Sequence, residues 1–112
     1  MQKIYRLTSS RSFDVIYKRG RSVSDESMAL VNLASKYQNI KVGFVVGKKV
    51  GKSVIRNRVK RRMRESFRQL IPKVTIGYSY IFIAKAKAAD MDYHGILSVI
   101  ERLLASANRL QQ

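Results

Sequence analysis

Residues 40–71, IKVGFVVGKKVGKSVIRNRVKRRMRESFRQLI, decide the fold of this chain. In residues 40–47 apolar side chains alternate with small or charged ones, and this period of two is typical of a β-strand. One side of the strand is apolar, whereas Gly43 and Gly47 help to keep the other side small. A second element can therefore approach that side of the strand closely.

Residues 53–71 have the period of an amphipathic helix, with Ser53 as its N-cap and Pro72 directly after its end. The apolar positions recur every three or four residues and predict one buried stripe. They are Ile55, Val59, Met63, Phe67 and Leu70. A strand followed by this long helix is the central unit of the predicted fold.

The segment between strand and helix, GKKVGKS at residues 47–53, resembles a phosphate-binding loop. That motif has four residues between its glycines, and here there are three. No later strand ends in an aspartate that could hold Mg²⁺. We therefore interpret Gly47 and Gly51 as turn residues and give nucleotide hydrolysis little weight.

A short helix is predicted over residues 8–19, with Thr8, Ser9 or Ser10 as its cap and Gly20 in the left-handed conformation after its end. Its apolar side chains share one face. They are Phe13, Ile16 and Tyr17. The rings of Phe13 and Tyr17 either stack on unpaired bases or pack in the core. Packing in the core is the more common role of such an apolar stripe.

Two further strands are predicted at residues 27–35 and 78–85, and Asp90 or Asp92 caps a last helix that runs to about residue 107. The inward positions of that helix are Ile96, Leu97, Ile100, Leu103 and Leu104. The order is α-β-β-α-β-α. It predicts one α+β domain over residues 1–112, built as a two-layer α/β sandwich.

The charge of the chain is strongly unbalanced, with 23 Lys and Arg against 7 Asp and Glu in 112 residues, a net charge of +16. Residues 48–68 hold ten basic residues and one acid, and residues 1–21 hold six basic residues and one acid. Such a surface indicates a polyanionic partner, with nucleic acid ahead of an anionic membrane or an acidic protein.

The long helix presents this charge in two directions when it is rotated by ~100° per residue. Arg56 and Lys60 lie along one edge of the apolar stripe, with Asn57 and Arg64 just beyond that edge. The remaining arginines of the helix lie elsewhere: Arg58, Arg61 and Arg68 point away from the core, and Arg62 borders the opposite edge of the stripe. A solvated helix face normally mixes signs, but like charges stack here at 56, 60, 64 and 68, which destabilises the helix unless phosphates neutralise it.

Enzymatic chemistry by the polypeptide itself is poorly supported. The chain has no cysteine, so it has no disulfide, thiolate zinc site or thiol nucleophile, and a reduced cytoplasm is the expected compartment. Its acids do not gather as a metal-dependent nuclease requires, and His94 is the single histidine. No apolar run reaches the ~18 residues of a membrane span. We expect a binding protein, or a subunit whose partner performs the chemistry.

Residues 42–67, VGFVVGKKVGKSVIRNRVKRRMRESF, resemble the signature of the bacterial ribonuclease P protein family, with RNR at residues 56–58 as its centre. Leu7, Phe13, Tyr17 and Gly20 are similar to the first helix of that family, and residues 80–85 to its last strand. The resemblance implies a left-handed β-α-β crossover, as in ribosomal-protein-S5-like domains, although right-handed crossovers are the general rule.

The resemblance also implies a function. Family members belong to a ribonucleoprotein endonuclease that removes the 5′ leader from precursor tRNA. The RNA subunit is the catalyst and holds most of the Mg²⁺, so neither catalytic residues nor metal ligands are expected in the protein. Its implied partners are the catalytic RNA and precursor tRNA, without a membrane, and it is expected to be a monomer in the holoenzyme.

The resemblance assigns site residues as well. The cleft for the precursor-tRNA leader is implied at Phe13, Tyr17, Val31, Val45, Arg56, Asn57 and Lys60. Contacts to the catalytic RNA are implied at Lys48, Lys49, Lys52, Arg58, Arg61, Arg62, Arg64 and Arg68. Some family members carry an aromatic residue at position 31 and a small hydroxyl residue at 45. Valine at both positions predicts weaker stacking or hydrogen bonding to a leader base.

Two other functions remain open at this point. The first is a general structured-RNA-binding or ribosomal-type protein without a leader-reading role. The second is binding to a membrane surface, which the fully charged outer face of the long helix disfavours because little apolar surface is left to insert.

Overall fold

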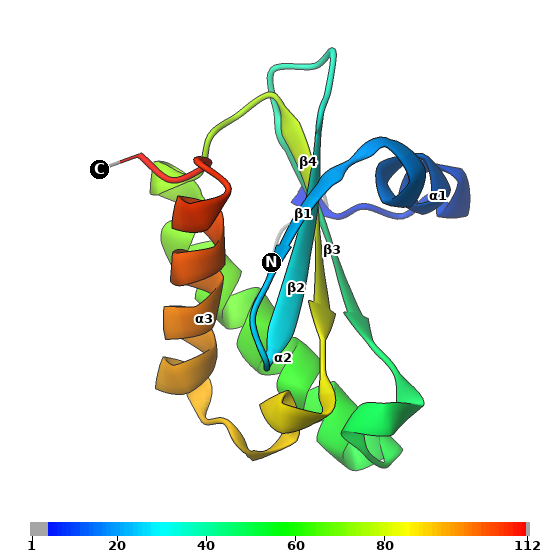
Figure 1. Ribbon diagram of the computed structural model, residues 1–112, viewed down its shortest axis with the longest axis vertical. Helices are drawn as coiled ribbons and strands as arrows, with labels where there is room; N and C mark the ends of the chain where they lie inside the picture. The colour runs from blue at the N-terminus through cyan, green and yellow to red at the C-terminus, as the bar shows by residue number, and fades with distance from the viewer. Residues whose placement is uncertain (1–4, 112) are drawn as a thin grey trace.

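The computed structural model describes residues 5–111 and contains one four-stranded sheet and three α-helices (Figure 1). The α-helices are α1 (Ser10–Arg19), α2 (Ser53–Leu70) and α3 (Tyr93–Ser106). The strands are β1 (Arg21–Ser24), β2 (Met28–Ala34), β3 (Ile40–Val46) and β4 (Tyr78–Ala84). Three short 3₁₀ helices lie between them, η2 (Lys48–Val50), η3 (Ile71–Lys73) and η4 (Ala86–Asp90).

The sheet has the strand order β1-β2-β4-β3. Its neighbours pair antiparallel except β3 and β4, which are parallel, so α2 forms the crossover between them. The predicted element order is confirmed, and the structure adds β1. This strand has only four residues, RSVS, and only Val23 among them is even half-buried, so no apolar alternation marks it in the sequence.

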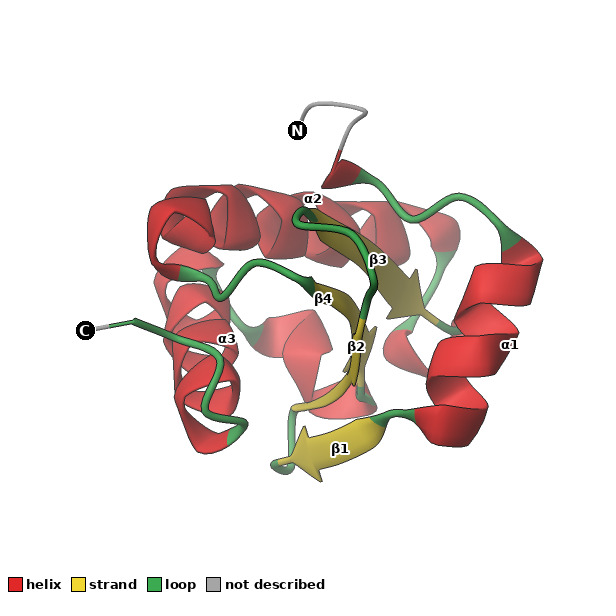
Figure 2. Cartoon of the chain, turned by 90° about the horizontal axis from the view of Figure 1, so that it is seen from above, coloured by secondary structure: helices red, strands yellow, loops and turns green. Residues whose placement is uncertain are grey.

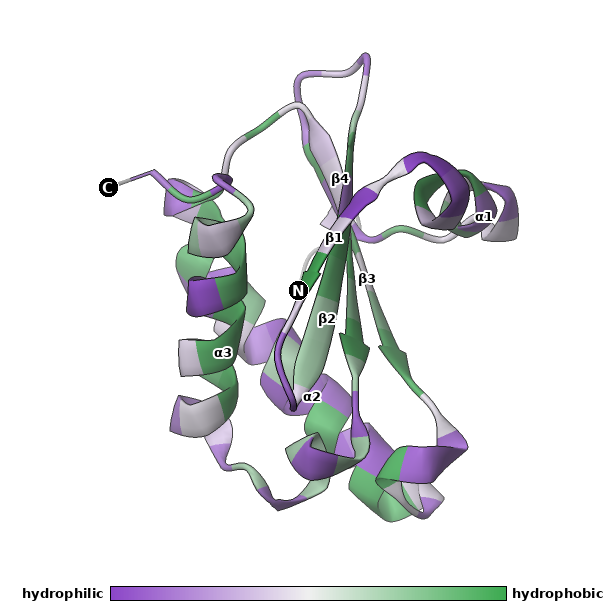
Figure 3. Ribbon diagram, viewed as in Figure 1, coloured by the Kyte–Doolittle hydropathy of each residue, from purple (hydrophilic) through white to green (hydrophobic). Residues whose placement is uncertain are grey.

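The predicted two-layer sandwich is formed by the sheet and by α2 and α3, which pack on one of its faces (Figures 1 and 2). The predicted stripe of α2 is confirmed, because Val59, Met63, Phe67 and Leu70 are buried and Ile55 packs against them. The stripe of α3 is confirmed as well. Figure 3 shows hydrophobic colours on the side of α3 that faces the sheet and mainly hydrophilic colours on its outer side.

Helix α1 lies on the opposite face of the sheet (Figure 2), where Ile16 packs on Val31 and Ile81 in a second, smaller cluster. The prediction that Gly20 is left-handed is wrong, since its backbone is extended with φ −73° and ψ 163°. A Cβ at Gly20 would lie 2.5 Å from the Ile16 carbonyl oxygen and 2.7 Å from a methyl carbon of Val31. Glycine is therefore required there by the close approach of α1 to β2.

The start of α2 also differs from the prediction, because its N-cap is Lys52 and Ser53 is already helical. Lys52 makes no side-chain capping hydrogen bond. Gly51, just before it, has a φ of +150°, which is a conformation that only glycine adopts readily. The interpretation of Gly51 as a turn residue is confirmed. At the other end, Pro72 lies in η3 directly after α2.

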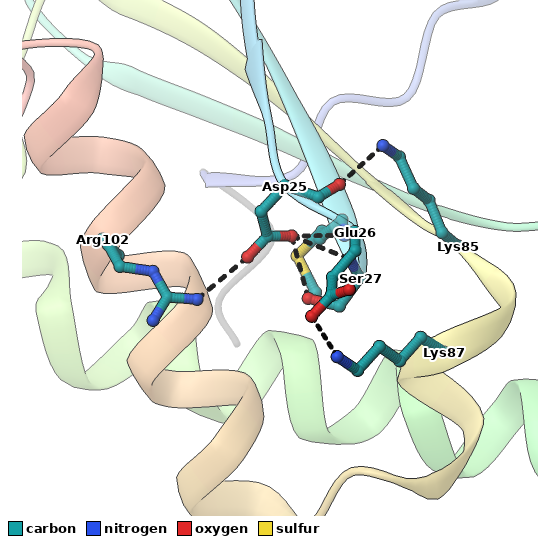
Figure 4. Close-up of polar contacts among 7 residues, drawn as sticks. Asp25, Glu26, Ser27, Lys85, Lys87 and Arg102 are labelled. Carbon is teal, nitrogen blue, oxygen red and sulfur yellow. Dashed lines mark hydrogen bonds and ion pairs between the residues drawn. The ribbon is translucent and has the colours of Figure 1, made fainter.

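Three of the acids serve at a turn or a helix cap. Asp25 accepts hydrogen bonds from the backbone of Ser27 and Met28 and pairs with Arg102 at 2.9 Å, while neighbouring Glu26 pairs with Lys87 (Figure 4). Asp92 caps α3 by accepting a hydrogen bond of 2.8 Å from the Gly95 amide. These carboxylates stabilise the β1–β2 turn and the α3 start.

Candidate nucleic-acid interface

A cleft of about 250 Å³ lies between α1, β3 and the edge of α2. Its walls are Phe13 of α1, residues 42–44 of β3, and Lys60 and Arg64 of α2. Arg6 and Leu7 close it on the N-terminal side. The cleft thus has an apolar floor, the Phe13 ring in its wall and cationic groups from two segments.

The floor of the cleft depends on Gly43. A Cβ at this position would lie 2.4 Å from Cζ and 2.7 Å from Cε1 of Phe13, so the ring rests directly on the β3 backbone. The prediction that an element approaches this side of β3 closely is confirmed, and that element is the Phe13 ring. Phe13 is half-buried, since it packs on the α1 cluster and also lines the cleft.

The other aromatic residue of α1 is more accessible. Tyr17 is 44% exposed, and its ring centroid lies 6.4 Å from that of Phe13. Partial burial, followed by the nearby Asp14 carboxylate, raises the pKa of the Tyr17 hydroxyl above its ordinary value, so this group stays protonated and can donate a hydrogen bond. Tyr17 and Phe13 together form an aromatic side of α1, the helix that packs on the sheet face opposite α2 and α3.

The two valines of the predicted leader cleft differ in accessibility. Val31 is 8% exposed and packs beneath α1 with Ile16 and Ile81, so it supports the helix from below. Val45 is half-buried at the edge of the same cluster and leaves part of its side chain open. Of these two positions, Val45 is the one that offers surface to a ligand.

The four basic or polar residues on the sheet-side edge of α2 form two pairs. Lys60 and Arg64 line the cleft together with Phe13. Arg56 and Asn57 lie one turn closer to the helix start and do not line that cleft. The Arg56 guanidinium is folded back onto the turn, donating to the Gly51 carbonyl at 3.1 Å and to the Ser53 hydroxyl at 3.3 Å.

The residues predicted to contact a catalytic RNA occupy four places in the structure. Arg61 and Arg68 are exposed on the outer face of α2, where Arg68 pairs with Glu65 at 2.8 Å. Lys48, Lys49 and Lys52 are exposed around η2 and the α2 N-terminus. Arg64 lies in the cleft instead, beside Lys60.

Arg58 and Arg62 lie on a third side of α2, one helical turn apart. Arg62 donates a hydrogen bond of 2.8 Å to the Met91 carbonyl, which links α2 to the segment before α3. The Nε of Arg58 is buried and has no hydrogen-bond partner in the described part of the chain. Both arginines are half-buried, whereas Arg61 and Arg68 are exposed to solvent.

Few acids neutralise this basic surface. Within residues 5–111 the ion pairs are Asp25–Arg102, Glu26–Lys87 and Glu65–Arg68, and only the last lies on α2. The same residues contain no group of three or more His, Asp or Glu side chains that could hold a metal ion. His94 is exposed on α3 against the Tyr93 ring. The arrangement is suited to binding polyanions.

Five residues of the cleft were not singled out as site residues by the sequence, namely Arg6, Leu7, Val42, Gly43 and Phe44. The segment of Arg6 and Leu7 runs along the free edge of β3, with the Leu7 amide 2.9 Å from the Val42 carbonyl oxygen. A single backbone bridge leaves no periodicity in the sequence. Glycine at position 43 was the available signal, and it predicted the close approach of another element to β3, without saying which element.

Comparison with known proteins gives one consistent result. The family model described as ribonuclease P matches residues 1–108. The chain belongs to the ribonuclease P protein family. The resemblance found in the sequence is confirmed, and the protein is a component of an endoribonuclease whose ribonucleoprotein nature implies an RNA partner.

Relatives and solved structures of the ribonuclease P family cover nearly the whole chain. The ribonuclease P protein component of Symbiobacterium thermophilum is 40% identical over 100% of this chain and 98% of its own. That of Alkaliphilus oremlandii is 42% identical, covering 96% and 95%. The RNase P protein of Staphylococcus aureus superposes with a TM-score of 0.88 at 30% identity, covering 96% and 98% of the two chains. That of Thermotoga maritima gives 0.83 at 28%, covering 90% and 96%.

Among the described residues, no helix is both long and apolar enough to cross a membrane. The rival membrane-surface function has no support from α2 either, since its apolar stripe is committed to the core. The basic residues of α2 remain at the surface, outside that core.

Proposed function

We propose that the protein binds the single-stranded 5′ leader of precursor tRNA in the cleft between α1, β3 and α2, and binds the catalytic RNA through the outer face of α2. In this function the RNA subunit cleaves the leader with Mg²⁺, and the protein raises the affinity for substrate. The observation that carries the proposal is the Phe13 ring on Gly43, flanked by Lys60 and Arg64.

The chemistry of this cleft fits an unpaired nucleotide. An aromatic ring next to cationic groups lets a base stack while its phosphates are neutralised, and such stacking contributes about 1–3 kcal/mol per base. Lys60 and Arg64 are on the same side of α2 and extend the contact along the phosphate backbone. Because the floor is apolar, and stacking and phosphate neutralisation are possible with any base, we expect weak preference for leader sequence.

The outer face of α2 fits the larger RNA. Arg61 and Arg68 are exposed on an 18-residue helix, and arginine donates to phosphate oxygens in pairs. This face points away from the cleft side of α2. One helix therefore offers two basic surfaces, and a substrate held in the cleft can be brought to the catalytic RNA on the other surface.

The test compares the affinities of precursor tRNA and mature tRNA for the complex of the protein with a bacterial catalytic RNA. We expect a clear preference for the precursor, and we expect Phe13→Ala to reduce it by about 5- to 150-fold, the equivalent of about 1–3 kcal/mol. Lys60→Ala should reduce it as well. The matched control is Lys73→Ala, which removes an exposed lysine of η3 outside the cleft.

Equal affinities for the two tRNAs in the wild-type complex would refute the leader-binding role. The protein would then be a general structured-RNA-binding subunit of the enzyme. Loss of thermal stability in Phe13→Ala without any change in precursor affinity would show that Phe13 only packs α1 onto the sheet.

A further inference from the structure

A second basic cluster lies at the edge of the sheet formed by β1, far along the strand order from the cleft. A pocket of about 390 Å³ lies there between the end of α1, the starts of β1 and β4, and the C-terminal segment. Arg19, Arg21 and Arg109 line it together with Asn32 and Tyr78. A smaller adjoining pocket of about 220 Å³ shares Arg21, Asn32 and Arg109, so the two form one groove.

The groove contains a guanidinium that is held in place. Arg109 lies over the Tyr78 ring, 3.8 Å from its centroid, and its Nε donates to the Asn32 side-chain oxygen at 3.1 Å. Asn32 is only 4% exposed, and its side-chain nitrogen donates to the Arg21 carbonyl at 3.1 Å. A buried amide with both ends bonded fixes Arg109, so little side-chain entropy is lost when this arginine binds a ligand.

The charge of the groove is not compensated by the described part of the protein. None of the residues that line the two pockets is acidic, and the ion pairs within residues 5–111 use Arg68, Lys87 and Arg102 as their cations. Arg19 and Arg21 are exposed and make no side-chain hydrogen bond within the described range. Three arginines around one groove without a carboxylate fit an anionic ligand.

A purely structural role explains only part of this cluster. The Arg109 carbonyl accepts a hydrogen bond of 2.9 Å from the Thr75 amide, so Arg109 also ties the C-terminal segment to the turn before β4. That role requires neither Arg19 nor Arg21. Their proximity to a fixed third arginine raises the repulsion within the free protein, and a bound phosphate would relieve it.

We propose that the groove between Arg19, Arg21 and Arg109 binds phosphodiesters of an RNA strand, as a contact site separate from the cleft and from α2. The strand order β1-β2-β4-β3 puts β1 and β3 at opposite edges of the sheet (Figure 2). The groove is lined by Arg21 at the start of β1, and the cleft by residues 42–44 of β3. The inference rests on the proposed function only in taking its ligand to be an RNA of the ribonuclease P complex. The phosphodiester belongs either to the catalytic RNA or to the precursor tRNA.

The test uses the double variant Arg19→Gln/Arg21→Gln in the full chain, because both side chains are exposed and neither has a described partner whose loss would unfold the protein. Its matched control is Lys18→Gln/Lys73→Gln, which removes the same charge from exposed sites that do not line the groove. Affinity is measured against salt concentration in two arms, the catalytic RNA alone and precursor tRNA added to the preformed complex. Thermal unfolding is followed in parallel.

Each lost phosphate contact lowers the slope of log affinity against log salt by about 0.7–0.9, which near 0.15 M salt corresponds to a loss of roughly four- to fivefold. We expect the Arg19→Gln/Arg21→Gln variant to lose RNA affinity by the amount that corresponds to one or two phosphate contacts, with unchanged thermal stability. The control variant should lose less affinity. The arm in which the slope changes identifies the RNA that supplies the phosphodiester.

An unchanged slope in both arms overturns the inference, and so does an equal loss in the control, because that would be a general charge effect. The ratio of precursor to mature tRNA affinity reports separately on the proposed function. If the wild-type complex shows no such preference, the leader-binding role fails, while the catalytic-RNA arm still decides whether the groove binds phosphate.

Discussion

Replacing Gly43 by alanine tests the geometry of the cleft with a single methyl group. The new Cβ would lie 2.4 Å from Cζ of Phe13, about 1 Å closer than the van der Waals contact distance of ~3.5 Å between carbon atoms. The β3 backbone is fixed by its pairing with β4, so the ring of Phe13 has to move by about that amount. The substitution therefore shifts the aromatic ring without removing it.

The expected result is a loss of leader binding that approaches the loss in Phe13→Ala. A displaced ring gives up part of the 1–3 kcal/mol that base stacking contributes, so precursor affinity should fall by about 5- to 30-fold while mature tRNA affinity is unchanged. Overpacking of this kind also lowers the free energy of unfolding by about 1–3 kcal/mol. Competition binding with the two tRNAs and urea unfolding measure the two effects.

The chain offers a matched control variant and a double-mutant cycle to test this prediction. A methyl group added at Gly47 would have no atom within 4 Å, and the φ of this residue is an ordinary −83°, so Gly47→Ala should change neither quantity. In a Phe13→Ala background the Gly43→Ala change should cost little further, because the clashing ring is gone. Additive losses in that double variant would refute the direct contact between position 43 and the ring as the cause.

Three further predictions concern the outer helix face, an acidic turn and a backbone conformation. Arg61→Ala or Arg68→Ala should each lower the salt slope of catalytic-RNA binding by about 0.7–0.9 and leave the ratio of precursor to mature tRNA affinity unchanged; an altered ratio would contradict the separation of the two surfaces. Burial opposes ionisation of Asp25, but hydrogen bonds from Ser27, Arg102 and Met28 outweigh it and hold its pKa below the ordinary value, so the stabilisation is present above about pH 3.8 and is lost as the pH falls through the lowered pKa. Asp25→Asn should therefore lower thermal stability at pH 7 and reduce its dependence on pH below about 4, and an unchanged acid profile would refute this. Gly51→Ala should lower the free energy of unfolding by about 1–3 kcal/mol, because its φ is +150° and its Cβ would lie 3.1 Å from Ile55; urea unfolding without such a loss would show that the turn rearranges freely.

The parts of the fold that the sequence predicted are those with strong apolar periodicity. The α2 stripe from Ile55 to Leu70 was found because burial against the sheet selects one residue type at every third or fourth position. The same holds for α3. β1 was missed because a short edge strand buries almost nothing. The predicted left-handed conformation of Gly20 was wrong because glycine is required there by a close contact with Val31, which lies on another element.

The candidate site was predictable to a similar extent. Helical rotation placed Arg56 and Lys60 on the sheet-side edge of α2 and Arg64 just beyond it, and of these Lys60 and Arg64 line the cleft. The pairing of Arg6 and Leu7 with β3, and the hydrogen bond of Asn32 with Arg109 across 77 positions, depend on tertiary contacts that no local pattern records. Glycine at position 43 was visible as a gap in the strand face, but only the fold supplies the ring that fills it.

The distribution of charge keeps the many basic side chains of this chain out of its core. Its main core, between the sheet, α2 and α3, consists of apolar and aromatic side chains, so the charges stay in water where their repulsion is screened within about 8–10 Å. Three of the seven acids, Asp25, Glu26 and Asp92, are used at the β1–β2 turn and at the cap of α3. The described residues that line the cleft and the β1-edge groove include no acid, so at both places the basic side chains are left for the RNA phosphates that we propose they bind.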